Sequence, residues 1–198
     1  MSTAPWPDHL LTLEEWDALP EDAHWHCELA EGVLIAIPRP APLHQRAMVR
    51  LTAMVDDQLP DELTALSDVE VLLDERHPAT VRAPDVVVTS DKLALENPPR
   101  LHASDVLLAV EVVSPGTGRT DRVTKLTEYA DAGIPHYWVV ELDQPATLTA
   151  YTLVDGDYEI VVQTTEPVQL SQPEPVTVDV RTLTARRWDR PGRRARTR

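Results

Sequence analysis

Two carboxylates interrupt short apolar runs in the middle of this 198-residue chain. Glu111 lies inside V-L-L-A-V-E-V-V, from Val106 to Val113, where all the other residues are apolar, and Asp85 opens the run P-D-V-V-V. Burying a carboxylate without a partner costs several kcal/mol even after the protein relaxes. We therefore expect a positively charged group to meet Glu111.

Strand geometry indicates that the two carboxylates can come together. In a strand, side chains two residues apart share a face, so Glu111 lies with Ala109 and Asp85 lies with Val87. If the two strands are neighbours, the carboxylates converge. Mg²⁺ binds one or two carboxylates and keeps several waters, so the pair predicts a metal site suited to phosphodiester hydrolysis.

A turn and a helix are predicted after the Glu111 strand. The residues from Ser114 to Gly118 are typical of a loop, and Thr120 is a suitable N-cap for a helix that runs to Ala132. Gly133 suits the left-handed position after the helix, and Pro135 prevents its continuation. The helix boundaries therefore follow from local chemistry.

This helix carries a lysine, Lys125, whose direction depends on which face is buried. We expect burial of three apolar residues, Val123, Leu126 and Ala130. That rotation turns Lys125 toward the flank that holds Asp121 and Tyr129, close to the end of the Glu111 strand. The alternative is a surface salt bridge, because Asp121 lies four residues before Lys125 and Glu128 three residues after it.

Local patterns predict the other elements. A capping box of Thr12 and Glu15 starts a short helix that ends by Pro20. The other predicted elements are a hairpin over His24–Ile37, helices over Leu43–Leu59 and Asp91–Leu95, strands over Val69–Asp74, His136–Leu142 and Val176–Val180, a loop over Arg76–Arg82, and a hairpin of Thr147–Val154 with Tyr158–Gln163. This alternation favours an α/β (α+β) fold in which helices flank a mixed sheet, with an additional hairpin at each end.

Several motifs together resemble the Uma-type restriction endonuclease family, within the P-D…(D/E)-x-K nuclease superfamily. The motifs are P-D (Pro84, Asp85), E-V-V-S-P (Glu111 to Pro115), D-x-x-x-K-x-x-x-Y (Asp121, Lys125, Tyr129) and G-I-P-H-Y-W-V-V (Gly133 to Val140). E-L-A-E-G (Glu28 to Gly32) and His44 also fit, so the resemblance covers about Leu13 to Leu183. It implies a restriction-endonuclease-like fold and a DNA endonuclease that depends on Mg²⁺ or Mn²⁺.

The resemblance also implies roles for individual residues. Asp85, Glu111 and the carbonyl of Val112 would hold the ion, and Glu28 would join them from the N-terminal hairpin. The superfamily's common lysine position, two residues after the glutamate, is Val113 here, so Lys125 is the implied catalytic lysine. Tyr129, His44 and Asp121 are implied supporting residues.

Structural roles remain open for the same residues. Asp85 could make turn hydrogen bonds after Pro84, and His44 could be a helix cap or a surface residue. Three functions are therefore weighed: a metal-dependent DNA endonuclease, a catalytically silent nuclease-fold protein that binds or regulates, and a hydrolase of a small anionic substrate. A narrow pocket in place of an open cleft would favour the last of these.

Charge is unevenly distributed along the chain. The net charge of −15 argues against a simple nucleic-acid binder, which usually carries a basic patch. Residues 186–198, however, hold seven arginines and one acidic residue. We expect one domain over residues 1–185 followed by this basic tail, which would either attract phosphate or serve as a disordered, solubilising terminus.

Compartment and partners follow from simpler features. The lone Cys27 excludes an intramolecular disulfide and a cysteine-based zinc cluster. The N-terminus M-S-T-A-P-W-P-D has no secretory-signal pattern, and no apolar run approaches the roughly 20 residues of a membrane span. We expect a cytoplasmic protein with no membrane partner, acting on duplex DNA as a homodimer by family analogy.

Overall fold

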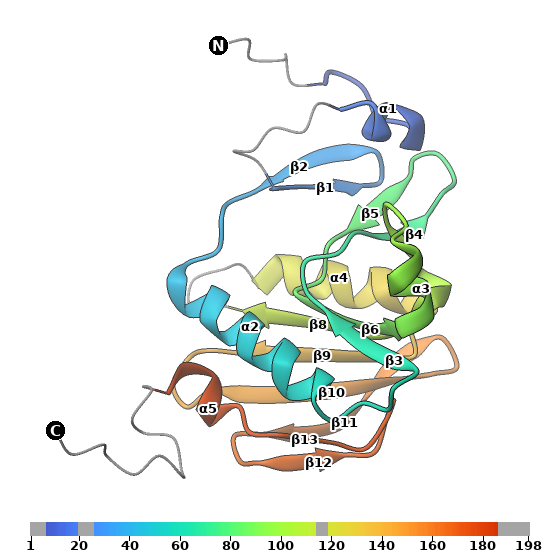
Figure 1. Ribbon diagram of the computed structural model, residues 1–198. Coiled ribbons are helices and arrows are strands. Elements are labelled where there is room, and N and C mark those ends of the chain that lie inside the picture. Colours follow the sequence, from blue (N-terminus) through green and yellow to red (C-terminus); the bar gives the residue numbers. More distant parts are fainter. Residues whose placement is uncertain (1–6, 20–25, 114–118, 186–198) are drawn as a thin grey trace, which may run out of the picture.

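Glu111 lies in a six-stranded mixed sheet, ordered β11-β10-β9-β8-β6-β3. Asp85 immediately precedes one strand of this sheet. The computed structural model describes residues 7–19, 26–113 and 119–185 (Figure 1). The strands of this sheet are β3 (Leu63–Leu66), β6 (Val86–Ser90), β8 (Val106–Val113), β9 (His136–Glu141), β10 (Thr147–Val154) and β11 (Asp157–Thr164). β8 is antiparallel to β6, with Val110 opposite Val86, and parallel to β9. The condition for convergence of the two carboxylates, that their strands be neighbours, is therefore met.

A five-stranded sheet, ordered β2-β1-β5-β4-β7, lies beside the first. Its strands are β1 (His26–Ala30), β2 (Val33–Ile37), β4 (Val71–Asp74), β5 (Thr80–Arg82) and β7 (Leu101–His102). The predicted N-terminal hairpin forms one edge of this sheet, and β1 pairs antiparallel with β5 with Leu29 opposite Val81. A separate two-stranded sheet joins β12 (Val168–Leu170) to β13 (Val176–Val178).

Four short strands were not predicted from the sequence: β3, β5, β7 and β12. Of these, β5 ends the segment that was predicted as a loop over Arg76–Arg82. β5 has only three residues and β3 only four, so neither gives a run long enough to show an alternating pattern. Pairing with other strands defines them: β5 pairs with β4, which directly precedes it, and with the distant β1, and β3 pairs with β6.

The two long helices cover opposite faces of the six-stranded sheet. The helices are α1 (Leu13–Asp17), α2 (Pro42–Asp56), α3 (Asp91–Glu96), α4 (Arg119–Asp131) and α5 (Arg181–Thr184), with a 3₁₀ turn η1 (Ala103–Asp105). Leu51 of α2 packs in one core with Val110, whereas Tyr129 of α4 packs in the other core with Ala109. Among the described residues, no helix has the length and apolarity that a membrane crossing requires.

The start of α1 and the end of α4 agree with the local signals, but α4 begins at Arg119, so Thr120 lies inside the helix and the prediction that it is the N-cap is wrong. Thr12 accepts from the backbone of Glu15, and the Glu15 carboxylate accepts from the backbone of Thr12, which confirms the capping box. Gly133 follows α4 with a φ of +80°, the left-handed conformation predicted for it, and its N–H donates to the carbonyl of Ala130.

Candidate active site

Asp85 immediately precedes β6. Its carboxylate, and not a backbone carbonyl, accepts the next hydrogen bond from β8. The N–H of Val112 donates to Asp85 Oδ2 at 2.7 Å. The next carbonyl, that of Val113, accepts from the N–H of Leu142 on the β9 side. Because N–H and C=O groups of successive strand residues point to opposite sides, the carbonyl of Val112 points toward the Asp85 side of the strand.

Glu111 projects from β8 toward α4 and meets two donors there. Tyr129 Oη donates to Glu111 Oε1 at 2.7 Å, and Lys125 Nζ donates to the same oxygen at 3.1 Å. Within the described residues, Glu111 Oε2 accepts no hydrogen bond. The positive group that the apolar strand demanded is therefore Lys125, which is itself buried.

Helix α4 turns a polar face to the sheets. Lys125, Glu128 and Tyr129 are spaced at i, i+3 and i+4, which places them on one side of the helix. The prediction that Val123 would be buried is wrong, since it is 69% exposed, whereas Ala130 is buried as expected. Ion pairing and the Tyr129 ring, and not the apolar residues alone, set the rotation of the helix.

Sequence reasoning missed the residue that connects these groups, Arg82 of β5. Its Nη1 donates to Glu28 Oε2 at 2.8 Å, and its Nε and Nη2 donate to the two oxygens of Glu128 at 2.7 Å each. The alternative of a surface salt bridge between Glu128 and Lys125 is therefore not supported, because both oxygens of Glu128 are bound by Arg82. The available signal was an arginine following an apolar residue directly before A-P-D, which is weak by itself.

Glu28 of β1 is fully engaged by neighbouring groups. Oε1 accepts from Lys125 Nζ at 3.0 Å and from the N–H of Ala83 at 3.3 Å, and Oε2 accepts from Arg82. Burial would raise the pKa of Glu28, but the charges of Lys125 and Arg82 outweigh it and lower the pKa below its ordinary value.

Glu111 has the opposite electrostatic balance. Burial raises its pKa to about 7; Lys125 opposes this rise, while the charges of Asp85 and Glu28 add to it. The hydrogen bond from Tyr129 acts in the lowering direction without cancelling it. Glu111 is thus a carboxyl group short of positive charge.

His44, on the first turn of α2, reaches the same corner from the other face of the sheet. Its Nε2 lies 3.4 Å from Asp85 Oδ2, and its Nδ1 is buried with no hydrogen-bond partner in the described part of the chain. The hydrogen bond to Asp85 raises the pKa of His44, although burial lowers it. Asp121 lies on α4, but its side chain is outside the described part of the structure.

The donors at this corner suit a hard divalent ion. Four carboxylates, of Glu28, Asp85, Glu111 and Glu128, stand among two permanent cations, Arg82 and Lys125. In the described ranges, no three His, Cys, Asp or Glu side chains form a ready metal-binding group. The remaining donor set is two carboxylates and one backbone carbonyl, which Mg²⁺ can complete with water.

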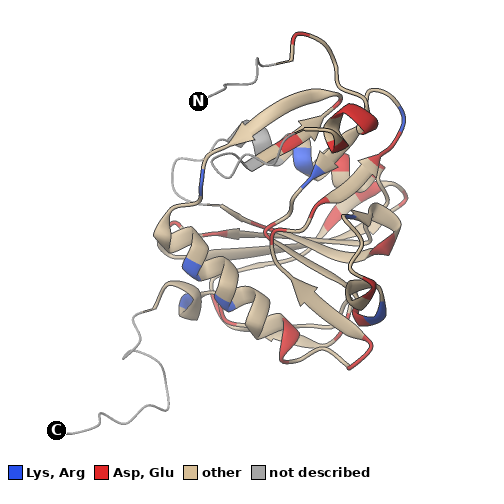
Figure 2. Cartoon of the chain, turned by 45° about the horizontal axis from the view of Figure 1, so that its top comes forward, with Lys and Arg blue, Asp and Glu red and all other residues tan. Residues whose placement is uncertain are grey.

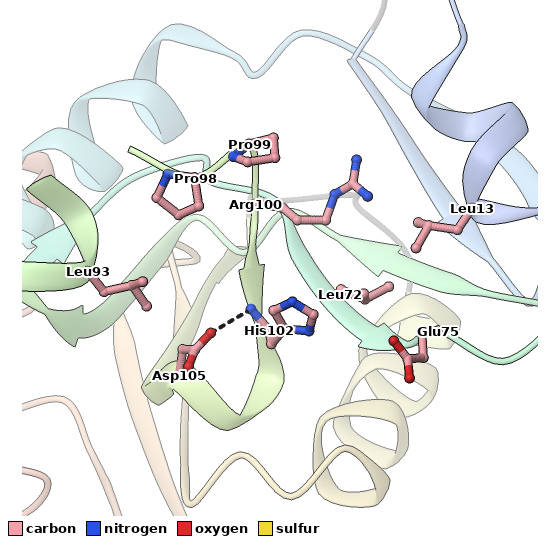
Figure 3. A pocket seen from close by; sticks show the side chains of 9 residues that line it. All are labelled: Leu13, Leu72, Glu75, Leu93, Pro98, Pro99, Arg100, His102 and Asp105. Atoms are coloured by element: carbon pink, nitrogen blue, oxygen red, sulfur yellow. Dashed lines mark hydrogen bonds between the residues drawn. The ribbon is translucent and has the colours of Figure 1, made fainter. Parts of the chain in front are cut away.

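A hollow of about 280 Å³ lies elsewhere, between α1, α3, β4 and β7 (Figure 3). Its lining is mainly apolar, and its Arg100 already pairs with Asp17 and Glu70. At its edge the backbone N–H of His102 donates to Asp105 Oδ2 at 3.0 Å. None of the carboxylates at the candidate site lines this hollow.

The comparisons with known proteins agree with the fold. Residues 13–186 match the model of a nuclease family described as "Uma2: Putative restriction endonuclease", and the chain belongs to this family. A solved structure from Anabaena variabilis ATCC 29413, described as "a putative nuclease belonging to DUF820", is similar with a TM-score of 0.66 and 18% sequence identity. The match covers 88% of this chain and 97% of that one. No curated protein matches the chain.

Proposed function

We propose that this protein is a metal-dependent endonuclease that hydrolyses phosphodiester bonds in DNA. One observation carries the proposal: Asp85 and Glu111 lie at the ends of adjacent strands, and the Lys125 ammonium lies 3.1 Å from Glu111. Two carboxylates beside a lysine are a sufficient set for this chemistry. Membership of a restriction-endonuclease family supports the same reaction class.

Each residue then has a role. Asp85, Glu111 and the Val112 carbonyl would hold Mg²⁺ or Mn²⁺, which when bound would polarise the phosphate and activate a water molecule. Lys125 would stabilise the negative charge that develops on the phosphate oxygens. Because both oxygens of Glu28 are engaged by neighbouring donors, we assign Glu28 to holding Lys125 and not to the ion.

Two groups at the edge of the site orient these ligands. Tyr129 fixes Glu111 through the 2.7 Å hydrogen bond to Oε1, which leaves Oε2 available to an ion. His44 faces Asp85, with Nε2 3.4 Å from Oδ2, and would orient that carboxylate. Both are supporting residues in this proposal.

DNA would approach along α2 and the basic C-terminal residues. In the described part of the chain, Figure 2 shows basic residues on α2, which are Arg46 and Arg50. Arg50 Nη1 donates to the carbonyls of Thr182, Leu183 and Ala185 at 2.8–2.9 Å. Arg50 lies about 9 Å along the helix from His44 at 1.5 Å per residue. The last described residue, Ala185, therefore lies beside the helix that reaches the site, and the arginine-rich residues 186–198 follow it in the sequence, outside the described ranges.

The proposal extends to organisation. Residues 1–185 would act as a single restriction-endonuclease-like domain, with residues 186–198 as a basic arm. Two copies would act on the two strands of a duplex, in the cytoplasm. The net charge of −15 disfavours the binding of DNA, which is also negatively charged. It therefore favours the second candidate, a nuclease-fold protein that binds a partner without cleaving DNA.

A plasmid-nicking assay tests the proposal. The wild type should nick DNA with Mg²⁺ or Mn²⁺ and should stop when a chelator is added. Calorimetry should detect Mn²⁺ binding by the wild type and none by Glu111→Ala, whereas Glu75→Ala, at the rim of the distant hollow, should bind and nick normally. Absence of both metal binding and nicking in the wild type would favour the silent binding protein.

A further inference from the structure

Arg82 donates hydrogen bonds to two elements that come from distant parts of the chain. Its side chain is only 2% exposed, and its donors reach Glu28 on β1, 54 residues away in sequence, and Glu128 on α4, 46 residues away. A buried guanidinium is retained at no net cost only when carboxylates satisfy it, as these two do. The two contacts of Arg82, with Glu28 and Glu128, therefore connect the five-stranded sheet to the helix that carries Lys125.

Strand register explains why Arg82 faces Glu28. Leu29 is opposite Val81 in the antiparallel β1–β5 pair, so Glu28 and Arg82 are also directly opposite each other. Side chains at opposite positions lie on the same face and within contact distance. The pairing of the two strands thus presents the Glu28 carboxylate to Arg82 by one oxygen and to Lys125 by the other.

The second contact acts through the helix itself. Glu128 lies three residues after Lys125, less than one turn away, and both of its oxygens are bound by Arg82. A two-bond contact of this kind fixes direction as well as distance. Arg82 consequently constrains the Lys125 ammonium by two routes: through Glu28, which accepts from it, and through the rotation of α4.

We propose that Arg82 is a positioning residue of the candidate active site, which holds the Lys125 ammonium against Glu111 by binding Glu28 and Glu128 at once. The inference rests on the proposed function only for its catalytic consequence, because the placement of Lys125 can be measured separately. Lysine cannot replace arginine here, since a single ammonium lacks the planar fork that serves both carboxylates.

The chain offers a direct measurement, because it contains only two lysines, Lys92 and Lys125. Protein labelled with ¹³C at lysine Cε gives two NMR signals: one from exposed Lys92, which is an internal control, and one from buried Lys125. Arg82→Lys adds a third lysine signal, which is identified because it persists when Lys125→Met is combined with Arg82→Lys. The Lys125 signal should move toward the free-lysine position and sharpen, while the Lys92 signal stays. Arg100→Lys, which also adds one signal, is the matched control, since Arg100 also bridges two carboxylates, and it should leave the Lys125 and Lys92 signals unchanged.

Glu128→Gln is the milder variant in case Arg82→Lys does not fold. It removes the ion pair between Arg82 and Glu128, at a partly exposed position. It should move the Lys125 signal in the same direction by a smaller amount. An unchanged Lys125 signal in the folded Glu128→Gln protein, or in folded Arg82→Lys, overturns the positioning role. A shift of both lysine signals together would indicate general loosening and would overturn it as well.

Cleavage kinetics give the catalytic consequence. Arg82→Lys should lower kcat on the order of 10²-fold with KM within a few-fold, the scale of a small misplacement of a catalytic group. In a Lys125→Met background the same change should have no further effect on kcat, because Arg82 acts through Lys125. An equal additional loss in that background would overturn the proposal. A wild type that does not nick DNA would overturn the proposed function instead, and the NMR result would still decide the placement of Lys125.

Discussion

Glu28 and Glu111 accept hydrogen bonds from the same ammonium group, yet their pKa values shift in opposite directions. Lys125 Nζ lies 3.0 Å from Glu28 and 3.1 Å from Glu111. Burial raises the pKa of both groups, but Glu28 is also bound by Arg82 and its pKa falls. Glu111 faces the negative charges of Asp85 and Glu28 in addition, and its pKa rises to about 7.

The comparison teaches that the second cation decides the role of each carboxylate. Glu28 has a full set of partners, so its charge is neutralised within the protein and its position is fixed. Glu111 shares one lysine and has an oxygen that accepts no hydrogen bond within the described residues, so it remains short of positive charge. A divalent ion would supply that charge, which is why we assign metal binding to Glu111 and structural support to Glu28.

Removing the charge of Glu28 should have the largest effect. Glu28→Gln leaves Arg82 and Lys125 with one carboxylate fewer in a buried setting, so we expect the free energy of unfolding at pH 7 to fall by about 3–5 kcal/mol. Because the folded pKa of Glu28 is below its ordinary value of 4.5, this contribution is present above that value and is lost as pH falls through the folded pKa. Urea denaturation against pH measures it. A loss under about 1 kcal/mol would remove the distinction between the two carboxylates.

Removing the shared cation should affect catalysis more than folding. We expect Lys125→Met to lower the cleavage rate by about 10²-fold or more, the scale of one lost charge contact in the transition state, while Mn²⁺ binding persists. Lys92→Met is the control and should cleave normally, because Lys92 is exposed and belongs to α3. If Lys125→Met cleaves at the wild-type rate, the catalytic lysine remains unassigned.

Neutralising Glu111 should stabilise the metal-free protein. A folded pKa near 7 against an ordinary 4.5 means that stability from Glu111 is full below about 4.5 and is lost as pH rises through about 7. Gln keeps the acceptor for Lys125 and Tyr129, so Glu111→Gln should gain about 2 kcal/mol at pH 8 in chelator. It should also flatten the pH dependence between about 4.5 and 7. A variant that is less stable than wild type at pH 8 would show that Glu111 acts as a stabilising ion-pair partner.

Deleting the residues after Ala185 should have the smallest effect on this pair of carboxylates. The stability of the remaining protein should change by no more than about 0.5 kcal/mol. DNA binding should weaken, and its logarithmic salt slope should fall by up to about 6, because seven arginines would no longer release counterions. Fluorescence anisotropy across a salt series measures the DNA affinity and its salt slope. An unchanged slope would show that the tail does not contact phosphate.

Local patterns predicted much of the fold for physical reasons that act over a few residues. The capping box of Thr12 and Glu15, the end of α4 at Gly133 and the C-terminal hairpin follow from backbone geometry that each short segment determines. The sequence left open whether the Asp85 and Glu111 strands are adjacent, and the structure shows that they are. Short strands such as β5 were not foreseen, because three residues carry too little periodicity.

By itself, the sequence determined that a carboxylate in the apolar run at Glu111 needed a positive partner, and it provided Lys125 within one helix of it. Only the tertiary structure decided how the charges are shared, because the partners meet through pairing of strands that are distant in sequence. Arg82 reaches Glu28 across 54 residues and Glu128 across 46. No local pattern encodes such contacts, since they depend on the β1–β5 register and on the rotation of α4, and both are set when the two sheets and the helix pack together.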